Sequence, residues 1–510
     1  MTSSVDMFVV GGGINGAAVA RDAAGRGLTV QLAEMGDYAG GTSSASSKLI
    51  HGGLRYLESY EFGLVRASLK EREVMLRIAP HLVFPMRFLL PITSTQPRPA
   101  FLVRLGLWLY DMMSGRKLLA PSGRLSAREV EALPRLRKEG VKAVLHYPDC
   151  WADDARLTLE TLLDARDRGA DIGNYREVTA IRPLDDGYLV EYRDRSGAHA
   201  TRARFVANAA GPWAARVLDR AEDAGRPRSL RFVRGSHIVI KMPEPAQADA
   251  YTLQIDDKRV VFVLPWLGRY LIVGTTDADH TADLSDVQCS DRERDYLIDG
   301  YNQFFSPPVG ADDIIWTYAG VRPLIDDGNA NLSEITRDYV LETEPRGSGG
   351  LVTVYGGKLT THRKLAGDVM AELAGLGANP GPEWTGDAPL HGGAMSRPEL
   401  SALAASETVL EPAIRERWVF TYGSEAAALF AAVRAEPALS AQVVPGIPEA
   451  ELIHAVETED ARTAEDFLYR RTKLFLSLDP PQTDTVKAWF ETYLRAKESS
   501  DEHGHDHQAG

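Results

Sequence analysis

Three glycines near the N-terminus, Gly11, Gly13 and Gly16, constrain the fold of this 510-residue chain more than any other feature. The apolar stretch directly before them predicts a strand over 7–10, and the alanine-rich stretch after them predicts a helix to about residue 26. A second predicted strand, over 28–33, ends at Glu34. The N-terminus is therefore predicted to form a βαβ unit, in about the thirty residues that such a unit needs.

The spacing of these glycines is typical of a dinucleotide site. The first glycine permits a tight turn, the second lets the backbone approach a pyrophosphate, and the third allows the helix to pack closely on the strand. The helix N-terminus adds backbone amides and the positive end of the helix dipole. Glu34 lies about twenty residues further on, where a carboxylate can bind ribose hydroxyls. The motif alone does not distinguish FAD from NAD.

Later parts of the chain favour FAD. An NAD-binding domain normally continues with alternating strands and helices, whereas here a polar loop and a β-rich insertion follow the βαβ unit. A predicted strand over 205–209 runs into Ala210-Gly211 and resembles the second nucleotide-contacting strand of flavoproteins. A predicted strand over 351–355 enters Gly356-Gly357 before a helix over 359–373, whose N-terminus would stabilise negative charge on a reduced flavin.

Strands that return to one nucleotide site from distant parts of the sequence imply interleaved domains. A hairpin is predicted over 259–274 and a strand pair over 187–207, while helices such as 423–433 and 461–475 follow a Gly- and Pro-rich linker at 375–395. We therefore expect an α/β (α+β) fold, in which an FAD-binding Rossmann-like domain is interleaved with a β-rich substrate domain and followed by a helical C-terminal domain. The expected boundaries are 1–80 with 150–225 and 335–385 for the FAD-binding domain, 81–149 with 226–334 for the substrate-binding domain, 386–500 for the helical domain, and 501–510 for a disordered, His-rich tail.

Composition excludes some functions. The chain has 57 basic and 71 acidic residues, a net charge of −14, which argues against a general nucleic-acid binder but not against a local basic pocket. Its two cysteines, Cys150 and Cys289, lie far apart and match no metal spacing, so no disulfide framework and no metal site are expected. Neither a secretory signal nor a run of about eighteen apolar residues occurs, so the cytosol or the cytosolic face of a membrane is the expected location.

Six further blocks occur in fixed order: TSSASSKLIHGGLRYL at 42–57, GSHI at 235–238, GTTD at 274–277, GVRPL at 320–324, ITRD at 335–338 and GGKLTT at 356–361. With GGGING at 11–16 and ARDAAGRG at 20–27, they make the chain resemble the bacterial FAD-dependent glycerol-3-phosphate dehydrogenases of the aerobic respiratory type. The chain departs from that family's pattern at His362, where tyrosine is usual, and at Ala18, where glycine is frequent.

The resemblance implies that non-covalently bound FAD oxidises sn-glycerol 3-phosphate to dihydroxyacetone phosphate, and that electrons pass to a membrane quinone, ubiquinone or menaquinone. It also implies a peripheral protein on the inner face of the cell membrane; a homodimer is permitted but not determined by the sequence. The FAD-binding residues that it implies are Gly11, Gly13, Asn15, Gly16, Glu34, Thr42, Ser43, Ser47, Lys48, Gly211, Gly357, Lys358, Leu359 and Thr360.

Oxidising a secondary alcohol requires removal of a hydride from carbon and of a proton from the hydroxyl, while the phosphate is held in place. Arginine suits a phosphate dianion because its planar fork matches the oxygens. The expected substrate-binding residues are Arg55, Tyr56, Arg322 and Arg337, and the expected catalytic residues are His237, Lys358 and Arg322.

Each of these residues also has a structural interpretation. The arginines could be surface residues in salt bridges, His237 could be a core histidine that bonds backbone carbonyls, and Lys358 could point to solvent from a helix start. In the resemblance, His237 accepts the hydroxyl proton, and Lys358 polarises the substrate oxygen or stabilises the reduced flavin. Asp153 and Asp154 are expected to cap a helix rather than form an acid/base pair.

Residues 101–110, FLVRLGLWLY, are apolar and aromatic, with Arg98 before them and Arg116-Lys117 after. This composition suits a helix in the headgroup region of a membrane, and a buried core helix is the alternative. Rival functions are a glycerol-3-phosphate oxidase that reduces oxygen, an amino-acid oxidase, and a flavin-binding sensor without turnover. The histidines at 503, 505 and 507 are expected in a solvated tail rather than in a metal site.

Overall fold

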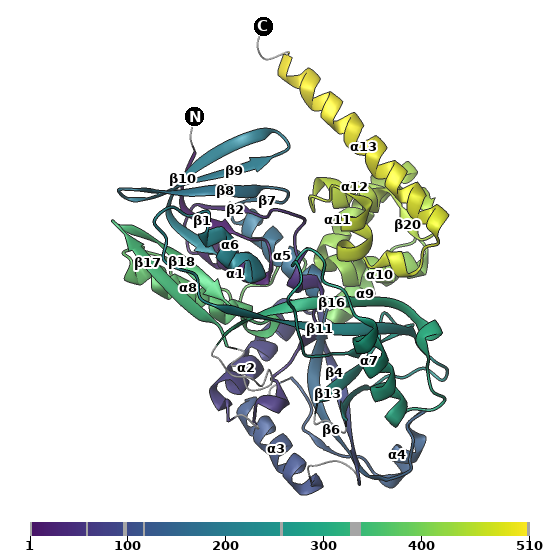
Figure 1. The fold of residues 1–510 in the computed structure, drawn as a ribbon. Helices are drawn as coiled ribbons and strands as arrows, with labels where there is room; N and C mark the ends of the chain where they lie inside the picture. The colour runs from purple at the N-terminus through teal and green to yellow at the C-terminus, as the bar shows by residue number, and fades with distance from the viewer. Residues whose placement is uncertain are drawn as a thin grey trace.

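The computed structural model describes residues 3–57, 60–94, 99–115, 118–255, 259–326 and 338–506. Two large sheets lie one above the other in Figure 1, with a helical C-terminal domain beside them and the last helix projecting away. This arrangement confirms the predicted fold class of a Rossmann-like domain, a β-rich domain and a helical domain. The exact domain boundaries stay a prediction.

The first sheet is built around parallel strands. Its order is β17-β18-β10-β1-β2-β7, and β9 and β8 extend it from β10. Alternate residues of each strand face opposite sides, so α1, α5 and α8 cover one face and α6 lies on the other. The elements are β1 (Ser3–Val10), α1 (Ile14–Gly25), β2 (Val30–Ala33), α5 (Asp154–Asp167), β7 (Asp171–Gly173), β8 (Glu177–Leu184), β9 (Gly187–Asp194), β10 (Gly197–Asn208), α6 (Ala214–Leu218), β17 (Val340–Arg346), β18 (Gly349–Tyr355) and α8 (His362–Gly375).

Three neighbouring strands of this sheet end in glycine turns at the same edge. Strand β10 pairs in parallel with both β1 and β18, so their carboxyl ends meet although they lie hundreds of residues apart in sequence. The chain leaves β1 into Gly11, β10 into the turn that contains Gly211, and β18 into Gly356-Gly357. The carboxyl edge of such a sheet is where nucleotides bind in this kind of fold, so the predicted convergence of segments is confirmed.

The second sheet is mostly antiparallel and lies below the first in Figure 1. Its order is β15-β11-β14-β13-β12-β4-β6-β3, with β16 paired to β11 and β5 to β6. The predicted hairpin is confirmed as β13 and β14. The elements are β3 (Leu49–Ile50), α2 (Phe62–Ile78), β4 (Val83–Thr93), α3 (Ala100–Met113), β5 (Gly123–Arg124), α4 (Ala127–Ala132), β6 (Val141–Ala152), β11 (Leu230–Lys241), β12 (Ala250–Gln254), β13 (Val260–Trp266), β14 (Tyr270–Gly274), β15 (Ala278–Asp279), α7 (Asp291–Phe304) and β16 (Ile314–Ile325).

The C-terminal domain is helical as predicted, but its helices differ in detail from the prediction. The segment expected as one helix over 461–475 is a π-helix, Asp466–Arg471, and a 3-10 turn, Leu474–Leu476, separated at Lys473, which has a positive φ of 61°. Ion pairs between this segment and distant residues, described below, determine its conformation in place of its helical sequence pattern. The helices are α9 (Arg397–Ser406), α10 (Pro412–Tyr422), α11 (Ala426–Ala435), α12 (Glu449–Glu457) and α13 (Pro480–Asp506).

The expectation of a disordered tail from residue 501 is corrected by α13, which continues to Asp506. A helix already formed upstream extends at little cost for each added residue, and this explains its run through a polar sequence. Residues 507–510 lie outside the described residues, and nothing is described of the side chains from 500 onward.

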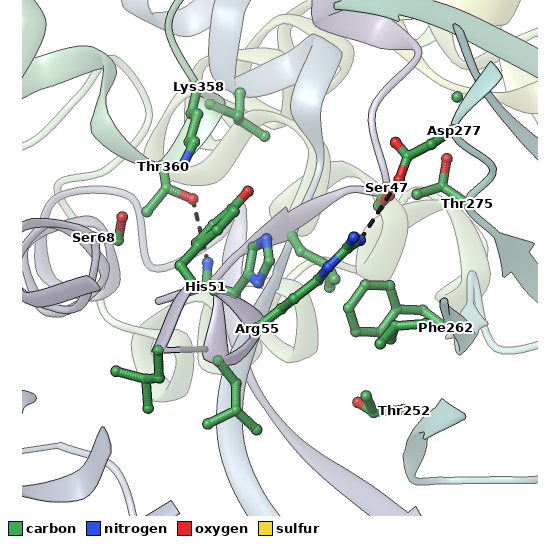
Figure 2. A pocket seen from close by; sticks show the side chains of 18 of the residues that line it. Ser47, His51, Arg55, Ser68, Thr252, Phe262, Thr275, Asp277, Lys358 and Thr360 are labelled. Carbon is green, nitrogen blue, oxygen red and sulfur yellow. Dashed lines mark hydrogen bonds and ion pairs between the residues drawn. The ribbon is translucent and has the colours of Figure 1, made fainter. Parts of the chain in front are cut away.

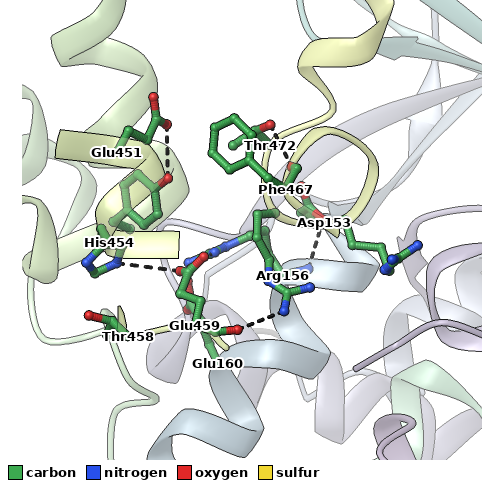
Figure 3. A network of polar contacts seen from close by, with 12 residues as sticks. Asp153, Arg156, Glu160, Glu451, His454, Thr458, Glu459, Phe467 and Thr472 are labelled. Atoms are coloured by element: carbon green, nitrogen blue, oxygen red, sulfur yellow. Dashed lines mark hydrogen bonds and ion pairs between the residues drawn. The ribbon is translucent and has the colours of Figure 1, made fainter. Parts of the chain in front are cut away.

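Buried ion pairs join the C-terminal domain to helix α5 (Figure 3). Arg156 of α5 binds Glu160 one turn on at 2.9 Å and Glu459 of the C-terminal domain at 2.5 Å. His81 Nε2 lies 2.6 Å from Glu160 on the same cluster. Asp153 caps α5 by accepting a hydrogen bond from the amide of Arg156 at 3.0 Å, which confirms the predicted cap.

Candidate active site

The glycine turn after β1 has the geometry that its motif predicts. Gly11 has a φ of +109°, which favours glycine, and a Cβ on Gly16 would lie 1.9 Å from the Gly11 carbonyl oxygen. The amide of Ile14, at the start of α1, donates to Ser43 Oγ at 2.9 Å. Gly16 therefore serves the packing of helix on strand, while Gly11, Gly13 and Ser43 line a cavity of about 640 Å³.

Glu34 lies at the edge of this cavity, where the sequence predicts the ribose contact. Its carboxylate accepts hydrogen bonds from the amides of Gly12 at 2.6 Å and Gly36 at 2.9 Å. Burial raises the pKa of Glu34 above its ordinary value, and the two amides act against that rise. Each carboxylate oxygen can accept more than one hydrogen bond, so capacity for a ribose hydroxyl is left.

Asn15 joins the first glycine turn to the last one. Its Nδ2 donates to the Gly356 carbonyl at 3.0 Å, and its Oδ1 is buried with no hydrogen-bond partner among the described residues. Gly357 has a φ of +101°, and a Cβ there would lie 2.6 Å from Asn15 Nδ2. A buried acceptor without a partner at a glycine cradle fits the approach of a polar cofactor group. The residues of this cavity therefore suit an FAD nucleotide.

A second cavity, of about 740 Å³, adjoins the first, and Figure 2 shows side chains that line it. Both are lined by Thr42, Gly320, Gly356, Gly357 and Leu359, so they form one elongated space. Of the residues predicted for the cofactor, Ser47, Lys358 and Thr360 line only the second part, and Gly11, Gly13, Asn15, Glu34, Ser43 and Gly211 line only the first. An extended dinucleotide with a reactive ring at one end fits this shape.

Three predicted cations line the second cavity. Arg322 binds Asp277 at 2.9 Å, and Arg55 lies 3.6 Å from the same carboxylate. Lys358 Nζ lies 3.9 Å from the ring centroid of Tyr56. Figure 2 shows Arg55 directed toward Asp277, with Lys358 on the opposite side of the cavity. The structure thus brings Arg55, Tyr56, Arg322 and Lys358 together around one space.

His237 lies on β11, immediately behind the cavity. It is only 1% exposed, and its Nε2 shares a hydrogen bond of 2.9 Å with the hydroxyl of Ser47, which lines the cavity. Burial, with further contributions from Arg322 and Lys48, lowers the pKa of His237 well below its ordinary value. The imidazole is therefore neutral near pH 7 and has a nitrogen available for a proton.

One predicted residue, Lys48, lies away from the cavity. Lys48 is 2% exposed and lines neither part of the cavity, because its ammonium group binds Asp154 at 2.7 Å beneath the loop. Arg337 lies outside the described residues. Sequence reasoning did not single out Asp277 or His51, although both stand in the quoted blocks and both line the cavity. The backbone amide of His51 donates to Thr360 Oγ1 at 3.3 Å, which links two of those blocks.

The C-terminal domain also reaches the nucleotide part of the cavity. Arg470, in the π-helix, lines that cavity and pairs with Asp37 on the loop after β2. Arg471 binds the same carboxylate, at 2.8 Å for its Nη2, and holds the pKa of Asp37 below its ordinary value against the effect of burial. No group of three or more His, Cys, Asp or Glu side chains in the described part of the chain could hold a metal ion.

A dinucleotide cavity at the carboxyl edge of a Rossmann-like sheet, continuous with a cationic cavity on a second sheet, defines a flavin-dependent oxidoreductase. The chain belongs to the family of FAD dependent oxidoreductases, whose model matches residues 6–363, and residues 384–490 match the C-terminal domain of alpha-glycerophosphate oxidase. FAD is therefore its cofactor, as predicted.

Relatives match almost the whole chain. It is 40% identical to the aerobic glycerol-3-phosphate dehydrogenase of Escherichia coli (strain K12), covering 96% of this chain and 98% of that protein. It is 43% identical to the D-erythritol 1-phosphate dehydrogenase of Brucella abortus (strain 2308), covering 95% and 97%. The glycerol-3-phosphate dehydrogenase of Bacillus halodurans, solved with FAD, superposes with a TM-score of 0.78 at 29% identity, over 96% and 90% of the two chains. The resemblance stated from the sequence is confirmed.

Proposed function

We propose that the protein oxidises sn-glycerol 3-phosphate to dihydroxyacetone phosphate. The observation that carries the proposal is the convergence of Arg55, Arg322 and Lys358 on a cavity continuous with the nucleotide site. FAD, when bound, supplies the acceptor for the hydride that leaves the substrate carbon. Relatives named as glycerol-3-phosphate dehydrogenases, at 40% and 42% identity, support the same substrate.

In this proposal Arg55 and Arg322 bind the substrate phosphate. Both guanidinium groups lie next to the carboxylate of Asp277, so they already face the same part of the cavity. Arg337 is assigned to the phosphate as well, on the family resemblance alone. Tyr56 borders the same space. Lys358 polarises the substrate oxygen or stabilises negative charge on the reduced cofactor, as a cation at the mouth of a helix can do.

His237 is the proposed acceptor of the hydroxyl proton. Because Ser47 lines the cavity and bonds Nε2 of His237, its hydroxyl is the shortest link between the substrate and the imidazole. We therefore assign Ser47 the passage of the proton to His237. The neutral imidazole, kept so by burial, is the form that can accept it.

Anaerobic bleaching of the flavin tests the proposal. The purified protein, with bound FAD, is mixed with sn-glycerol 3-phosphate without oxygen, and the flavin absorbance is followed. Rapid bleaching, with dihydroxyacetone phosphate as product, is expected. A flavin that stays oxidised at excess substrate would contradict the proposal and favour a sensor without turnover. Stoichiometric hydrogen peroxide in air without quinone would favour the oxidase, and bleaching by amino acids alone would favour an amino-acid oxidase.

A four-carbon alditol phosphate is the second candidate substrate. The 43% identical relative from Brucella abortus is named for D-erythritol 1-phosphate. The hydroxyls of Tyr147 and Thr252 share a bond at 2.7 Å in the cavity wall. Each of the two hydroxyls carries one proton, and the bond between them uses only one of these protons. The other hydroxyl can therefore donate a hydrogen bond to a further hydroxyl of the substrate. The ratio of flavin reduction rates for the two substrates decides between them.

We further propose that electrons leave to a membrane quinone at the inner face of the cell membrane. Helix α3 buries Val103, Leu107 and Tyr110 but exposes Phe101 (73%), Trp108 (56%) and other apolar side chains on its outer face. Leu102, Val103, Leu105, Gly106 and Leu109 of the same helix line the cavity, so α3 adjoins both the surface and the site. An exposed apolar and aromatic helix face suits the headgroup region. Arg98, Arg116 and Lys117, predicted to flank it, lie outside the described residues.

No helix in the described part of the chain is long and apolar enough to cross a membrane. Flotation with lipid vesicles tests the contact: the double substitution Phe101→Ser and Trp108→Ser should abolish co-flotation and reduction of a vesicle-bound quinone, but not flavin bleaching. Val409→Ser, at a residue 45% exposed in the C-terminal domain, is the matched control and should float like the wild type. Equal flotation of both variants would contradict the assignment of α3.

A further inference from the structure

We propose that Tyr318 is a positioning residue for His237, and that Phe475 of the C-terminal domain holds the aromatic stack that does so. This inference rests on the proposed function, in which His237 accepts the substrate proton. It assigns the C-terminal domain a part in the reaction, through an aromatic contact on the same face of the substrate sheet as His237.

Strand pairing places His237 in a slot. On β11, His237 lies opposite Gly274 of β14 on one side and opposite Tyr318 of β16 on the other. A Cβ on Gly274 would lie 2.0 Å from His237 Cδ2, so the imidazole occupies the space that the glycine leaves. The other face of the ring stacks on Tyr318, with centroids 4.6 Å apart and planes 7° from parallel. The plane of the imidazole is thus set by Tyr318.

Among the described residues, a single hydrogen bond sets the rotation of the ring within that plane. His237 Nε2 bonds Ser47, and Nδ1 is buried without a hydrogen-bond partner among the described residues. The Gly274 side of the slot offers only backbone, so the aromatic wall comes from Tyr318. Loss of the Tyr318 ring would therefore let the imidazole tilt and lengthen its contact with Ser47.

The stack continues away from the cavity into the C-terminal domain. Tyr318 donates its hydroxyl to the Ser46 carbonyl at 3.0 Å. Trp316, two residues earlier on the same face of β16, lies 4.8 Å from Tyr318, and Phe475 lies 4.8 Å from Trp316 at 72°, an edge-on contact. Nearby, Tyr270 donates its hydroxyl to the Leu476 carbonyl at 2.9 Å. The 3-10 turn that carries Phe475 is thus fixed to the sheet that carries His237.

Stopped-flow reduction of the FAD-loaded protein by sn-glycerol 3-phosphate, without oxygen and across pH 6 to 9, tests the stack. We expect Tyr318→Leu to lower the limiting rate about tenfold, since misplacement of a proton acceptor by a fraction of an ångström has effects of this order. The substrate dissociation constant should stay within about twofold, because His237 does not hold the phosphate. Tyr318→Phe, which keeps the ring, should restore the rate to within about threefold.

The pH profile separates positioning from a general loss of structure. Removal of the ring admits water beside His237, so the pH of half-maximal rate should rise toward the ordinary value of histidine. The charged groups nearest the imidazole, Arg322 and Lys48, are the same in both variants. An unchanged rate and profile in Tyr318→Leu would overturn the proposal, and so would a Tyr318→Phe variant as slow as Tyr318→Leu.

Phe475→Leu tests the part of the C-terminal domain and does not touch the cavity. We expect its limiting rate to fall about threefold with FAD content unchanged. Phe490→Leu is the matched control, because Phe490 is 2% exposed in the core of the same domain. Equal rates in the two variants would overturn the assignment of Phe475. A wild-type protein that glycerol 3-phosphate does not reduce would instead refute the proposed function, independently of the stack.

Discussion

Substitution of His362 by asparagine should make the protein less sensitive to acid. His362 stands at the start of α8, where the family pattern has tyrosine, and is 2% exposed. Burial lowers its pKa to about 4, partly offset by the bond from Nδ1 to the Leu359 carbonyl at 2.6 Å. In the unfolded chain the pKa is about 6.5. Asparagine keeps a donor near the position of Nδ1 and removes the titration.

The direction in which stability changes with pH follows from proton binding at His362. Between pH 6.5 and 4 the unfolded chain holds a proton at this site that the folded protein does not, so stability falls as the pH falls through that window. The stabilisation is fully present above about pH 6.5. A shift of this size is worth about 3.4 kcal/mol in total, of which about 2 kcal/mol is lost between pH 7 and pH 5.

Thermal unfolding at a fixed excess of FAD measures the difference. For a chain that unfolds as one unit, about 2 kcal/mol corresponds to a change in Tm of about 2 °C, and a smaller cooperative unit gives a larger change. The Tm of the wild type should therefore fall about 2 °C more than that of His362→Asn between pH 7 and 5. Between pH 7 and 8 the difference between the two proteins should stay constant. Parallel curves down to pH 5 would refute the reasoning.

Four further substitutions test the site. Gly274→Ala should keep FAD bound but slow its reduction, because the new methyl group displaces His237. His237→Ala should also keep FAD bound and should lower the rate of flavin reduction about a hundredfold or more. A wild-type reduction rate in either variant would be contrary evidence. Arg471→Leu should weaken FAD binding and lower Tm, since it removes one of the two arginine partners of buried Asp37 and leaves only Arg470; fluorescence titration of the apoprotein with FAD measures the weakening. Arg322→Ala should raise the substrate dissociation constant more than the reduction rate falls, and an unchanged constant would exclude Arg322 from the phosphate site.

The nucleotide half of the molecule could be predicted because its signals are local. The turn at Gly11 needs a positive φ, and the packing at Gly16 needs the absence of a side chain, so the sequence motif states the geometry directly. The interleaving of β10 and β18 beside β1 could be inferred as well, since each strand ends in a glycine turn suited to the same ligand.

Features that depend on distant partners could not be predicted. The segment after residue 461 has a helical pattern, but Arg470 and Arg471 both bind Asp37, more than four hundred residues earlier in the chain, and Lys473 binds Asp153. These buried contacts decide its conformation, with a π-helix and a residue of positive φ. Lys48 was assigned to the cofactor with Ser47, yet only Ser47 lines the cavity, because Asp154 binds the ammonium group of Lys48.

The two sequence interpretations of His237, a core residue and a proton acceptor, are not exclusive. Its imidazole is buried like the residues of the core, and that burial, with the nearby charges of Arg322 and Lys48, keeps it neutral. A buried histidine can serve the reaction only if some group connects it to the substrate, and in our proposal that group is Ser47, which bonds His237 Nε2. Sequence pattern can propose the histidine and the serine separately. Their pairing depends on β11, β14 and β16 lying side by side, with Gly274 leaving the space and Tyr318 filling the opposite wall.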